Sequence, residues 1–402
     1  MAVGEASFPH MPAIDGVRLS AAMAGIKKPN RRDLVVIEIP EGGSVAATFT
    51  RNAFCAAPVH VAKAHLAQTS PRYLLINTGN ANAGTGSRGI ADAERCCSAL
   101  AELAGVDAQQ VLPFSTGVIG EPLPVEKIAA GLPQALAGLD GGQWAEAAEG
   151  ILTTDTRVKG ATAQVELSGG TVTLNGISKG SGMIKPNMAT MLGFVACDAE
   201  IPAATLNQWL REAVAVSFNA ITVDSDTSTN DACTLIATGR GPQVVSAEDE
   251  RRFRAALTQV LTELAQAIIR DAEGATKFVT LEVEEAASVE EAREVAFTVA
   301  HSPLVKTALY ASDANWGRIL AAVGRAPVEA LDVERIVIDL GDVRLVEHGG
   351  RAESYTEAAG SRVMAQAEIT IRIRLGRGEA RATVWTSDLS HDYVSINADY
   401  RS

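Results

Sequence analysis

Short apolar runs near the start of the chain predict buried strands. They occupy residues 33–39, 45–49 and 73–77, and the first reads Asp-Leu-Val-Val-Ile-Glu-Ile. Brief runs rich in Val and Ile favour strands over helices. A helical pattern follows at about 90–103 and ends at Gly105, a residue type that commonly terminates helices. We therefore expect three strands and then a helix.

The middle of the chain predicts a hairpin and two helices. Residues 164–174 contain two strand patterns on either side of Gly169-Gly170, an arrangement typical of a hairpin. A helix is expected at about 203–216. Ser246-Ala-Glu-Asp249 has the spacing of a capping box and opens a long helix with an apolar stripe,. That stripe is expected to face the core.

The last third predicts strands and another capped helix. Residues 278–283 have a strand pattern, and Ser288-Val-Glu-Glu291 caps the helix that follows,. Residues 368–375 alternate strictly between polar and apolar, and a further strand pattern, 381–385, follows across Gly376-Arg-Gly378. We expect these last two strands to pair as a half-exposed antiparallel hairpin.

Composition and charge narrow the class of protein. The 402 residues are too many for one small core, so two or more subdomains are expected,. Hydrophobic residues make up 47% and charged residues 21% of the chain, which indicates a globular protein,. The net charge of -13 argues against a nucleic-acid partner,.

Location and metal content follow from what the sequence lacks. No apolar run reaches the length of a membrane span, and the first residues lack the pattern of a secretion signal,. We therefore expect a cytoplasmic protein with no membrane partner. The five cysteines have no Cys-x-x-Cys spacing and no nearby histidines, so they are expected to be reduced thiols rather than metal ligands,.

Two loops match ligand-binding motifs only in part. The loop around Gly79 and Gly84 has the glycine spacing of a phosphate loop, but Thr85 stands where Lys is needed,. The acidic loop from Asp224 has Thr229 at the position where a calcium loop needs Gly,. Neither a nucleotide cofactor nor calcium is expected, and no other cofactor is predicted.

The stretch from Lys179 to Phe194 is polar and Gly-rich at first and becomes apolar at Met191. Pro186 and the neighbouring glycines constrain a turn that leads Thr190 onto a buried strand. The simplest interpretation is a loop that enters a core strand.

A chemical interpretation of the same stretch concerns the Ala189–Thr190 peptide bond. A threonine hydroxyl held by a strained turn can attack the preceding carbonyl, and hydrolysis after this acyl shift would leave Thr190 as a new N-terminus. Its α-amino group, with an ordinary pKa of about 7.7–8.0, could then serve as base for its own hydroxyl. Thr190 would thus combine nucleophile and base in one residue.

The segment from Phe114 to Gly120 follows a short apolar strand and has two interpretations. One is a turn whose Ser and Thr cap the helix that begins near Val125. The other is an oxyanion hole, in which the Thr116 hydroxyl and the Gly117 backbone N–H stabilise a developing tetrahedral oxyanion.

The central stretch resembles a known family. Lys179-Gly-Ser-Gly-Met-Ile, followed by Pro-Asn-Met-Ala-Thr-Met-Leu, is similar to the self-cleavage segment of the ornithine acetyltransferase family, also called glutamate N-acetyltransferases of arginine biosynthesis. The similarity runs from about residue 50 to the last residue. It implies cleavage between Ala189 and Thr190, with Thr190 as the nucleophile.

The resemblance also implies the remaining site residues. Thr116 and Gly117 would form the oxyanion hole, while Lys179 suits a substrate carboxylate and Glu273 an ammonium group. Hydrogen bonds to the substrate would come from Thr156, Asn397 and Ser402. The family pattern usually has Gly where Ser225 and Ala272 stand, which questions the local backbone conformation rather than the chemistry.

The fold that the resemblance implies is α+β, with layered mixed sheets flanked by helices, of the self-processing N-terminal-nucleophile type. Residues 1–189 would form an α chain, and residues 190–279 would complete the catalytic core. Residues 280–402 would form a smaller C-terminal α/β subdomain, with a tail that returns to the active site.

The implied activity is transfer of acetyl from N-acetylornithine to glutamate through acetyl-Thr190. The sequence leaves open whether acetyl-CoA is also a donor, and the family suggests two copies of each cleaved chain. Two alternatives remain: an N-terminal-nucleophile amidohydrolase or aminopeptidase, in which water takes the acyl group, and an uncleaved amino-acid-binding protein.

Overall fold

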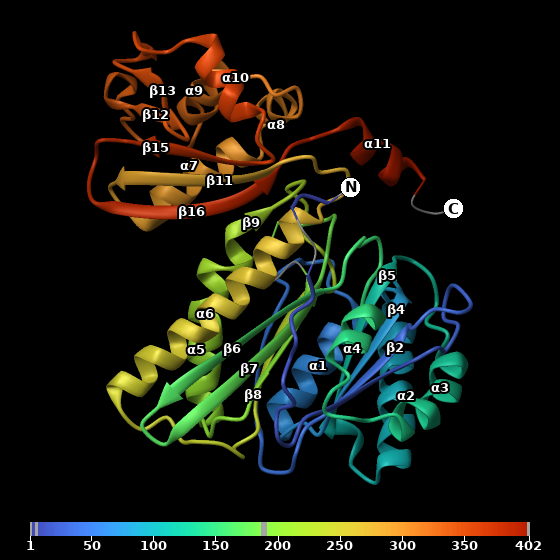
Figure 1. Ribbon diagram of the computed structural model, residues 1–402. Coiled ribbons are helices and arrows are strands. Elements are labelled where there is room, and N and C mark those ends of the chain that lie inside the picture. Colours follow the sequence, from blue (N-terminus) through green and yellow to red (C-terminus); the bar gives the residue numbers. More distant parts are fainter. Residues whose placement is uncertain (1, 5–6, 186–190, 400–402) are drawn as a thin grey trace.

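The computed structural model describes residues 2–4, 7–185 and 191–399 (Figure 1). The predicted cleavage site, Ala189 and Thr190, and the predicted substrate residue Ser402 lie outside the described residues.

The first sheet is formed by the early part of the chain. Its strand order is β1-β2-β4-β5, and only β4 and β5 run parallel. Helices α2 and α3 cover one face of this sheet through a common apolar cluster. The bounds are β1 Arg18–Ala22, β2 Leu34–Glu38, β4 Tyr73–Asn80, β5 Val111–Val118, α1 Ala57–Gln68, α2 Gly86–Ala104, η1 Ala108–Gln110, α3 Val125–Ala137 and α4 Trp144–Gly150.

The second sheet draws its strands from both sides of residues 186–190. Its order is β3-β10-β8-β7-β6, with β8 and β10 parallel and the other neighbours antiparallel. One apolar cluster joins this sheet to the first, and another joins it to α5 and α6. The bounds are β3 Ser44–Phe49, β6 Lys159–Leu167, β7 Gly170–Lys179, β8 Leu192–Cys197, β10 Ala232–Ala237, α5 Ala203–Val216, η2 Phe218–Ala220 and α6 Ala247–Arg270.

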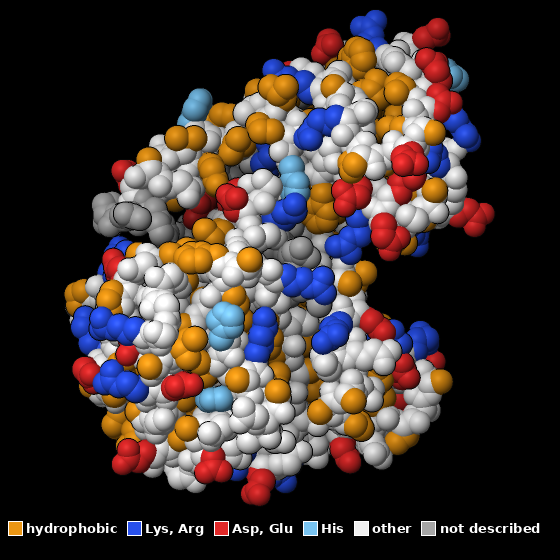
Figure 2. Space-filling model, turned by 180° about the vertical axis from the view of Figure 1, so that it is seen from behind, with side chains coloured by type: hydrophobic (Ala, Val, Ile, Leu, Met, Phe, Trp, Pro, Cys, Tyr) orange, Lys and Arg blue, Asp and Glu red, His pale blue; other side chains and the backbone are white. Residues whose placement is uncertain are grey.

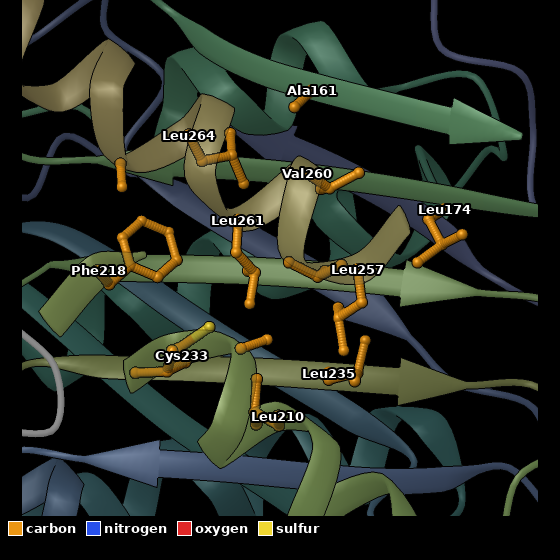
Figure 3. Packing of buried hydrophobic residues seen from close by; sticks show 14 of the residues in the cluster. Ala161, Leu174, Leu210, Phe218, Cys233, Leu235, Leu257, Val260, Leu261 and Leu264 are labelled. Carbon is orange, nitrogen blue, oxygen red and sulfur yellow. The ribbon is translucent and has the colours of Figure 1, made fainter. Parts of the chain in front are cut away.

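Helix α6 packs on the second sheet as its apolar stripe predicts. Leu257, Val260, Leu261 and Leu264 are fully buried, and Figure 3 shows them directed at the strands that carry Leu174 and Leu235. The predicted capping box is present, because the Ser246 side chain accepts a hydrogen bond from the Asp249 N–H and the Asp249 carboxylate accepts one from the Ser246 N–H. Helix, sheet, sheet and helix therefore form four layers, and the predicted α+β class is confirmed.

The third sheet has a core of its own and forms the upper lobe in Figure 1. Its order is β14-β13-β12-β15-β11-β16-β9. Figure 2 shows the surface indented between this lobe and the rest of the molecule. The bounds are β9 Ile221–Thr222, β11 Phe278–Ala286, β12 Val337–Leu340, β13 Val343–Glu347, β14 Gly350–Arg351, β15 Glu368–Arg374, β16 Ala380–Ser387, α7 Val289–Ala300, α8 Pro303–Tyr310, α9 Trp316–Gly324, η3 Val333–Arg335 and α10 Glu357–Met364.

The predicted hairpin of the last two long strands is wrong. β15 and β16 do not pair with each other, because β11 lies between them, parallel to β15 and antiparallel to β16. Their connection crosses the end of β11, where the N–H groups of Arg377 and Gly378 both donate to the Glu285 carbonyl. Local alternation identified both strands correctly, but it carries no information about a third strand some 90 residues earlier.

In the part of the chain that the structure describes, no helix is both long and apolar enough to cross a membrane. All five cysteines are free thiols, and four of them are buried.

Candidate functional site

A cavity of about 430 Å³ lies where strands of the first and second sheets end. Its walls come from seven separate segments of the chain. Five of the predicted site residues line it together: Thr116, Gly117, Lys179, Glu273 and Asn397. The fold thus brings together residues as distant in sequence as Thr116 and Asn397, which are 281 positions apart.

Thr116 and Gly117 lie at the end of β5. Gly117 has φ of +136°, and a Cβ there would overlap the backbone of Gly79 on the parallel neighbour β4. Only glycine fits this close approach, so the residue type follows from the pairing of β4 with β5. The buried Thr116 hydroxyl accepts a hydrogen bond from Lys179 Nζ at 3.2 Å, which leaves its own proton available for another acceptor.

Lys179 ends β7 and is buried. Its Nζ donates to the Thr153 hydroxyl at 2.7 Å as well as to Thr116. Burial lowers the pKa of the Lys179 ammonium group, and the Asp155 carboxylate opposes that effect. The cation therefore lies beside the proposed oxyanion donor rather than at the solvent edge.

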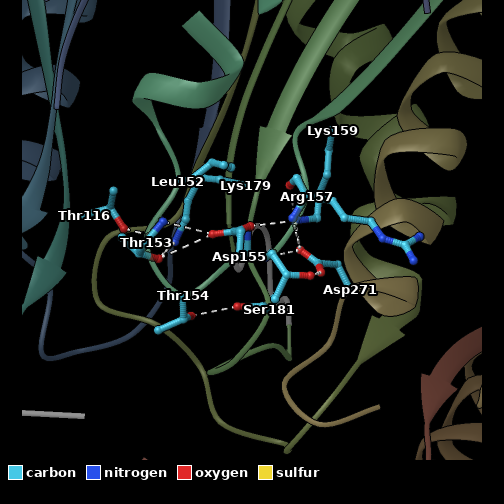
Figure 4. A network of polar contacts seen from close by, with 12 residues as sticks. Thr116, Leu152, Thr153, Thr154, Asp155, Arg157, Lys159, Lys179, Ser181 and Asp271 are labelled. Carbon is cyan, nitrogen blue, oxygen red and sulfur yellow. Dashed lines mark hydrogen bonds and ion pairs between the residues drawn. The ribbon is translucent and has the colours of Figure 1, made fainter. Parts of the chain in front are cut away.

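A buried polar network supports Lys179 (Figure 4). Asp155 accepts hydrogen bonds from Lys159 Nζ at 2.6 Å, from the Gly180 N–H at 2.7 Å and from the Thr153 N–H at 3.0 Å. Burial raises the pKa of Asp155, but Lys159 and Lys179 outweigh it and hold the pKa below its usual range. The ionised carboxylate thus fixes Thr153 and the turn after Lys179 against each other.

Thr156 is not brought into the cavity. Its hydroxyl and its N–H both donate to the Asp271 carboxylate, which also accepts from Lys159. Thr153 and Thr154 line the cavity instead. All of these threonines belong to one short polar stretch, and the sequence alone does not tell which of them faces the ligand.

Glu273 follows α6, and its carboxylate lies against Gly182, where a larger residue would not fit. A Cβ at Gly182 would overlap the Glu273 carboxylate, and the Glu273 N–H donates to the Ser181 carbonyl at 2.9 Å. Asn397 Nδ2 donates to Glu273 Oε2 at 2.8 Å. A carboxylate with one amide partner and an open cavity in front of it can bind an ammonium group.

Asn397 belongs to α11 (His391–Ala398), the helix that ends the described chain. Tyr393 of this helix contacts the acidic loop, because its hydroxyl donates to Asp224 Oδ2 at 3.2 Å. Ser390 adds a hydrogen bond to the Gly274 carbonyl, whereas Val394 is 63% exposed. The helix is therefore held by a few polar contacts at one side.

The acidic loop after β9 supplies contacts that the sequence analysis did not predict. Asp224 accepts from the Met183 and Ile184 N–H groups at 2.6 and 2.9 Å, close to where the described chain stops at residue 185. Ser225 has φ of +67°, which explains why glycine would suit this position. The failed match to a calcium loop drew attention to this segment, but not to its true contacts.

Asn230 and Asp231 end the same loop. Asn230 Nδ2 donates to the carbonyls of Ala81 and Ser115, so it ties the cavity wall to both β4 and β5. Asp231 is buried, and its Oδ2 has no hydrogen-bond partner among the residues that the structure describes. Burial raises the pKa of its carboxyl group. Among the described residues, no cluster of His, Cys, Asp and Glu could hold a metal ion.

Comparison with known proteins gives a consistent result along the sequence. The family model described as the ArgJ family matches residues 18–402. The arginine biosynthesis bifunctional protein ArgJ of Pseudomonas fluorescens (strain Pf0-1) is 57% identical over 406 residues, covering 100% of both chains. The protein of the same name from Methylococcus capsulatus is 58% identical over 393 residues, covering 97% of this chain and 96% of its own.

Solved structures include the arginine biosynthesis bifunctional protein ArgJ of Bacillus halodurans. It is 37% identical, covers 50% of this chain and 95% of its own, and has a TM-score of 0.48. The ornithine acetyltransferase of Mycobacterium tuberculosis, complexed with ornithine, is 32% identical, covers 44% of this chain and 94% of its own, and has a TM-score of 0.38. Given the family match and the full-length relatives, the chain belongs to the ArgJ family and is an acyltransferase enzyme of arginine biosynthesis.

Proposed function

We propose that this enzyme moves an acetyl group from N-acetylornithine to glutamate through an ester on Thr190, giving ornithine and N-acetylglutamate. One observation carries the proposal: a single cavity combines the Thr116–Gly117 pair, buried Lys179 and the Glu273–Asn397 pair. Acyl transfer to an amino acid needs both of these parts, an oxyanion site and a site for a charged substrate. The names of the full-length relatives support the pathway.

Self-cleavage comes first in the proposed mechanism. The Thr190 hydroxyl attacks the Ala189 carbonyl, the C–N bond breaks, and the Thr190 nitrogen takes up a proton as a free amine. Water then hydrolyses the ester, which leaves a carboxylate on Ala189 and restores the hydroxyl. Met191, which follows directly, is anchored because its carbonyl accepts from the Ala232 N–H at 2.9 Å.

Acetyl transfer then proceeds in two halves. The free Thr190 amine takes the hydroxyl proton while the oxygen attacks the acetyl carbonyl of N-acetylornithine. The Thr116 hydroxyl and the Gly117 N–H stabilise the oxyanion, and the ornithine amine leaves with the proton. The glutamate amine attacks acetyl-Thr190 in the same way and releases N-acetylglutamate.

Substrate recognition is assigned by charge and position. Glu273 binds the ammonium group of the amino-acid substrate, and Asn397 holds the Glu273 carboxylate in place through a hydrogen bond. Lys179 is assigned to carboxylate or oxyanion charge, and Thr153 takes the hydrogen-bonding role first given to Thr156, whose hydroxyl is used by Asp271. Ser402 keeps its proposed role at the end of the tail.

Further features of the proposal concern donors and assembly. The word bifunctional in the relatives' name supports a second activity, and we assign acetyl-CoA as a second donor to Thr190. The cleaved α and β chains are proposed to assemble as two copies of each in the cytoplasm.

Intact-mass spectrometry after acid quench tests the central step. With N-acetylornithine and no acceptor, the chain that starts at Thr190 should gain one acetyl group, while residues 1–189 stay unmodified. Adding glutamate should remove the label and yield N-acetylglutamate. Turnover without any labelled chain would refute the ester intermediate, and equally fast loss of the label to water would identify a hydrolase.

A further inference from the structure

Asp155 is a buried carboxylate that the proposed mechanism does not use. Its side chain is 0% exposed, and it lies in the turn between α4 and β6, beside Lys179 and Thr116 (Figure 4). Burying a charged carboxylate costs free energy unless hydrogen bonds and opposite charges compensate for the lost hydration. The contacts that compensate for it here lead to the proposed oxyanion site.

Three hydrogen bonds to Asp155 fix the surroundings of Lys179. Its Oδ1 accepts from the N–H of Gly180, the residue directly after Lys179, at 2.7 Å. Its Oδ2 accepts from the Thr153 N–H at 3.0 Å and from the Thr153 hydroxyl at 3.5 Å. The oxygen of that hydroxyl in turn accepts from Lys179 Nζ at 2.7 Å. Asp155 therefore reaches Lys179 through the backbone at Gly180 and through the side chain of Thr153.

Asp155 also balances the charge of Lys179. Burial lowers the pKa of the Lys179 ammonium group, and the Asp155 carboxylate is the strongest influence that opposes this effect. Lys159 on β6 lowers the pKa of Lys179 further. Asp231, just before β10, and Glu273, after α6, raise it, but each does so less than Asp155 does. Of the carboxylates around Lys179, Asp155 thus does most to keep this side chain protonated.

The charge of Lys179 decides which way its hydrogen bond with Thr116 runs. Nζ and the Thr116 hydroxyl oxygen are 3.2 Å apart. An ammonium group has three protons and no acceptor, so it can only donate, and the Thr116 proton is left for another acceptor. A neutral amine has a lone pair and can accept that proton instead. Thr116 would then donate to Lys179 rather than to a substrate oxyanion.

We infer that Asp155 is a positioning residue of the proposed oxyanion site: by holding Lys179 as a cation, it keeps the Thr116 proton directed at the substrate. The inference rests on the proposed function, in which Thr116 donates to the oxyanion. Asp155 does not line the substrate cavity, so it acts through Lys179 and Thr116. Hydrogen bonds in a buried chain strengthen one another, and loss of the charge at Asp155 should therefore be felt at Thr116.

The pH dependence of kcat, with N-acetylornithine and glutamate as substrates, tests the inference. Native activity should fall at high pH as Lys179 loses its proton. Asp155→Asn keeps the shape of the side chain and removes its charge, so this fall should move to lower pH. Asp271→Asn is the matched control, because Asp271 is a buried carboxylate of the same network that bonds to Thr156 and Lys159. In the control the fall should stay at the native pH.

A double-mutant cycle separates positioning from a general effect on the fold. Thr116→Ala alone should slow turnover by about 10²–10³. Asp155→Asn alone should approach that loss at high pH, with little change in KM. Because Asp155 acts through Thr116, the double variant should be no slower than Thr116→Ala. Effects that multiply in the double variant, or an Asp155→Asn profile equal to the native one, would overturn the inference.

Lys179→Arg tests the inference without any change at Asp155, and so remains informative where Asp155→Asn does not fold. The guanidinium group stays charged throughout the accessible pH range and has no acceptor. Thr116 can then only accept from it, and the fall of kcat at high pH should disappear. A fall that persists in Lys179→Arg at the native pH would show that Lys179 is not the titrating group and would overturn the inference.

NMR titration of the lysine side chains needs no turnover and separates the inference from the proposed function. The Lys179 signal is identified by its absence in Lys179→Arg. Its pKa should be lower in Asp155→Asn than in the native enzyme, and equal values would overturn the inference. A lowered pKa in an enzyme that transfers no acetyl from N-acetylornithine would refute the proposed function, while the control of the Lys179 charge by Asp155 would stand.

Discussion

The Thr116 oxygen accepts a hydrogen bond from Lys179, and in the proposed mechanism its proton is donated to the substrate oxyanion. Thr116→Ala should therefore keep substrate affinity and slow turnover. Removal of one oxyanion donor typically costs about 10²–10³ in rate, or about 2.7–4 kcal/mol. Steady-state kinetics with N-acetylornithine measure the effect, and Thr116→Ser, which keeps the hydroxyl, should recover most of the rate. An increase in KM with unchanged kcat would reassign Thr116 to substrate binding.

Lys306 is a buried residue outside the cavity wall, and its protonation should affect stability. Its Nζ donates to the Thr386 hydroxyl and the Ser387 carbonyl. Burial lowers the pKa of Lys306 to about 8, although Asp388 and Asp224 oppose the shift. Between about pH 8 and its ordinary pKa near 10.5, the unfolded chain holds this proton and the folded chain does not. Stability therefore rises with pH in that window.

Denaturant unfolding of the native chain and of Lys306→Met measures this contribution. From pH 7.5 to 10.5 the native chain should gain stability relative to the variant, by up to about 3 kcal/mol. Other groups that titrate in this range are common to both proteins and cancel in the difference. Parallel curves for the two proteins would show that Lys306 has an ordinary pKa.

At the residue scale, the family resemblance named residues that the fold brings together. Thr116, Gly117, Lys179, Glu273 and Asn397 were all named from the sequence, and all five line one cavity. The choice between Thr153 and Thr156 was not accessible, since it depends on which hydroxyl Asp271 captures. The network of Asp155, Lys159 and Asp271 could not be foreseen, because these residues meet only after β6, β7 and α6 have packed.

At the element scale, strands and helices with strong local signals were predicted well. The helix at 203–216 and the capped helix from Ser246 lie where expected, because apolar period and cap residues act within one element. Pairing was not predicted, as the separation of β15 from β16 by β11 shows. The four layers also could not be derived from local pattern, because central strands such as β8 and β10 are buried along their whole length and show no alternation.

Helix α11 offers a test of how one element completes the site. Tyr393→Phe removes the hydrogen bond to Asp224 without changing the apolar contacts of the ring. Looser docking should move Asn397 away from Glu273 and raise the KM for the amino-acid substrates by up to about tenfold, the value of one hydrogen bond to a charged group. Val394→Ala, on the exposed side of the same helix, is the control and should behave as the native chain. An unchanged KM in Tyr393→Phe would mean that the other contacts suffice.

At the scale of the whole molecule, the proposed cleavage would cut a chain whose two parts are already interleaved. In the second sheet, β3, β6 and β7 precede residue 189, while β8 and β10 follow residue 190. Strand β10 pairs with β3, and β8 pairs with β7. Two strands of the second cleavage product, β8 and β10, therefore lie between strands of the first. Separation would break two antiparallel ladders and expose the cluster shared by both sheets.

The cleavage products should therefore stay together under native conditions. A denaturing gel should show two chains, residues 1–189 and 190–402, while native mass spectrometry should show them only as a complex. Because burial of apolar surface and paired strand edges both oppose dissociation, the complex should persist through dilution and gel filtration. The uncleaved control, Thr190→Ala, should give one chain on the gel and the same native assembly. Release of free residues 1–189 without denaturant would contradict the strand interleaving as the main link between the parts.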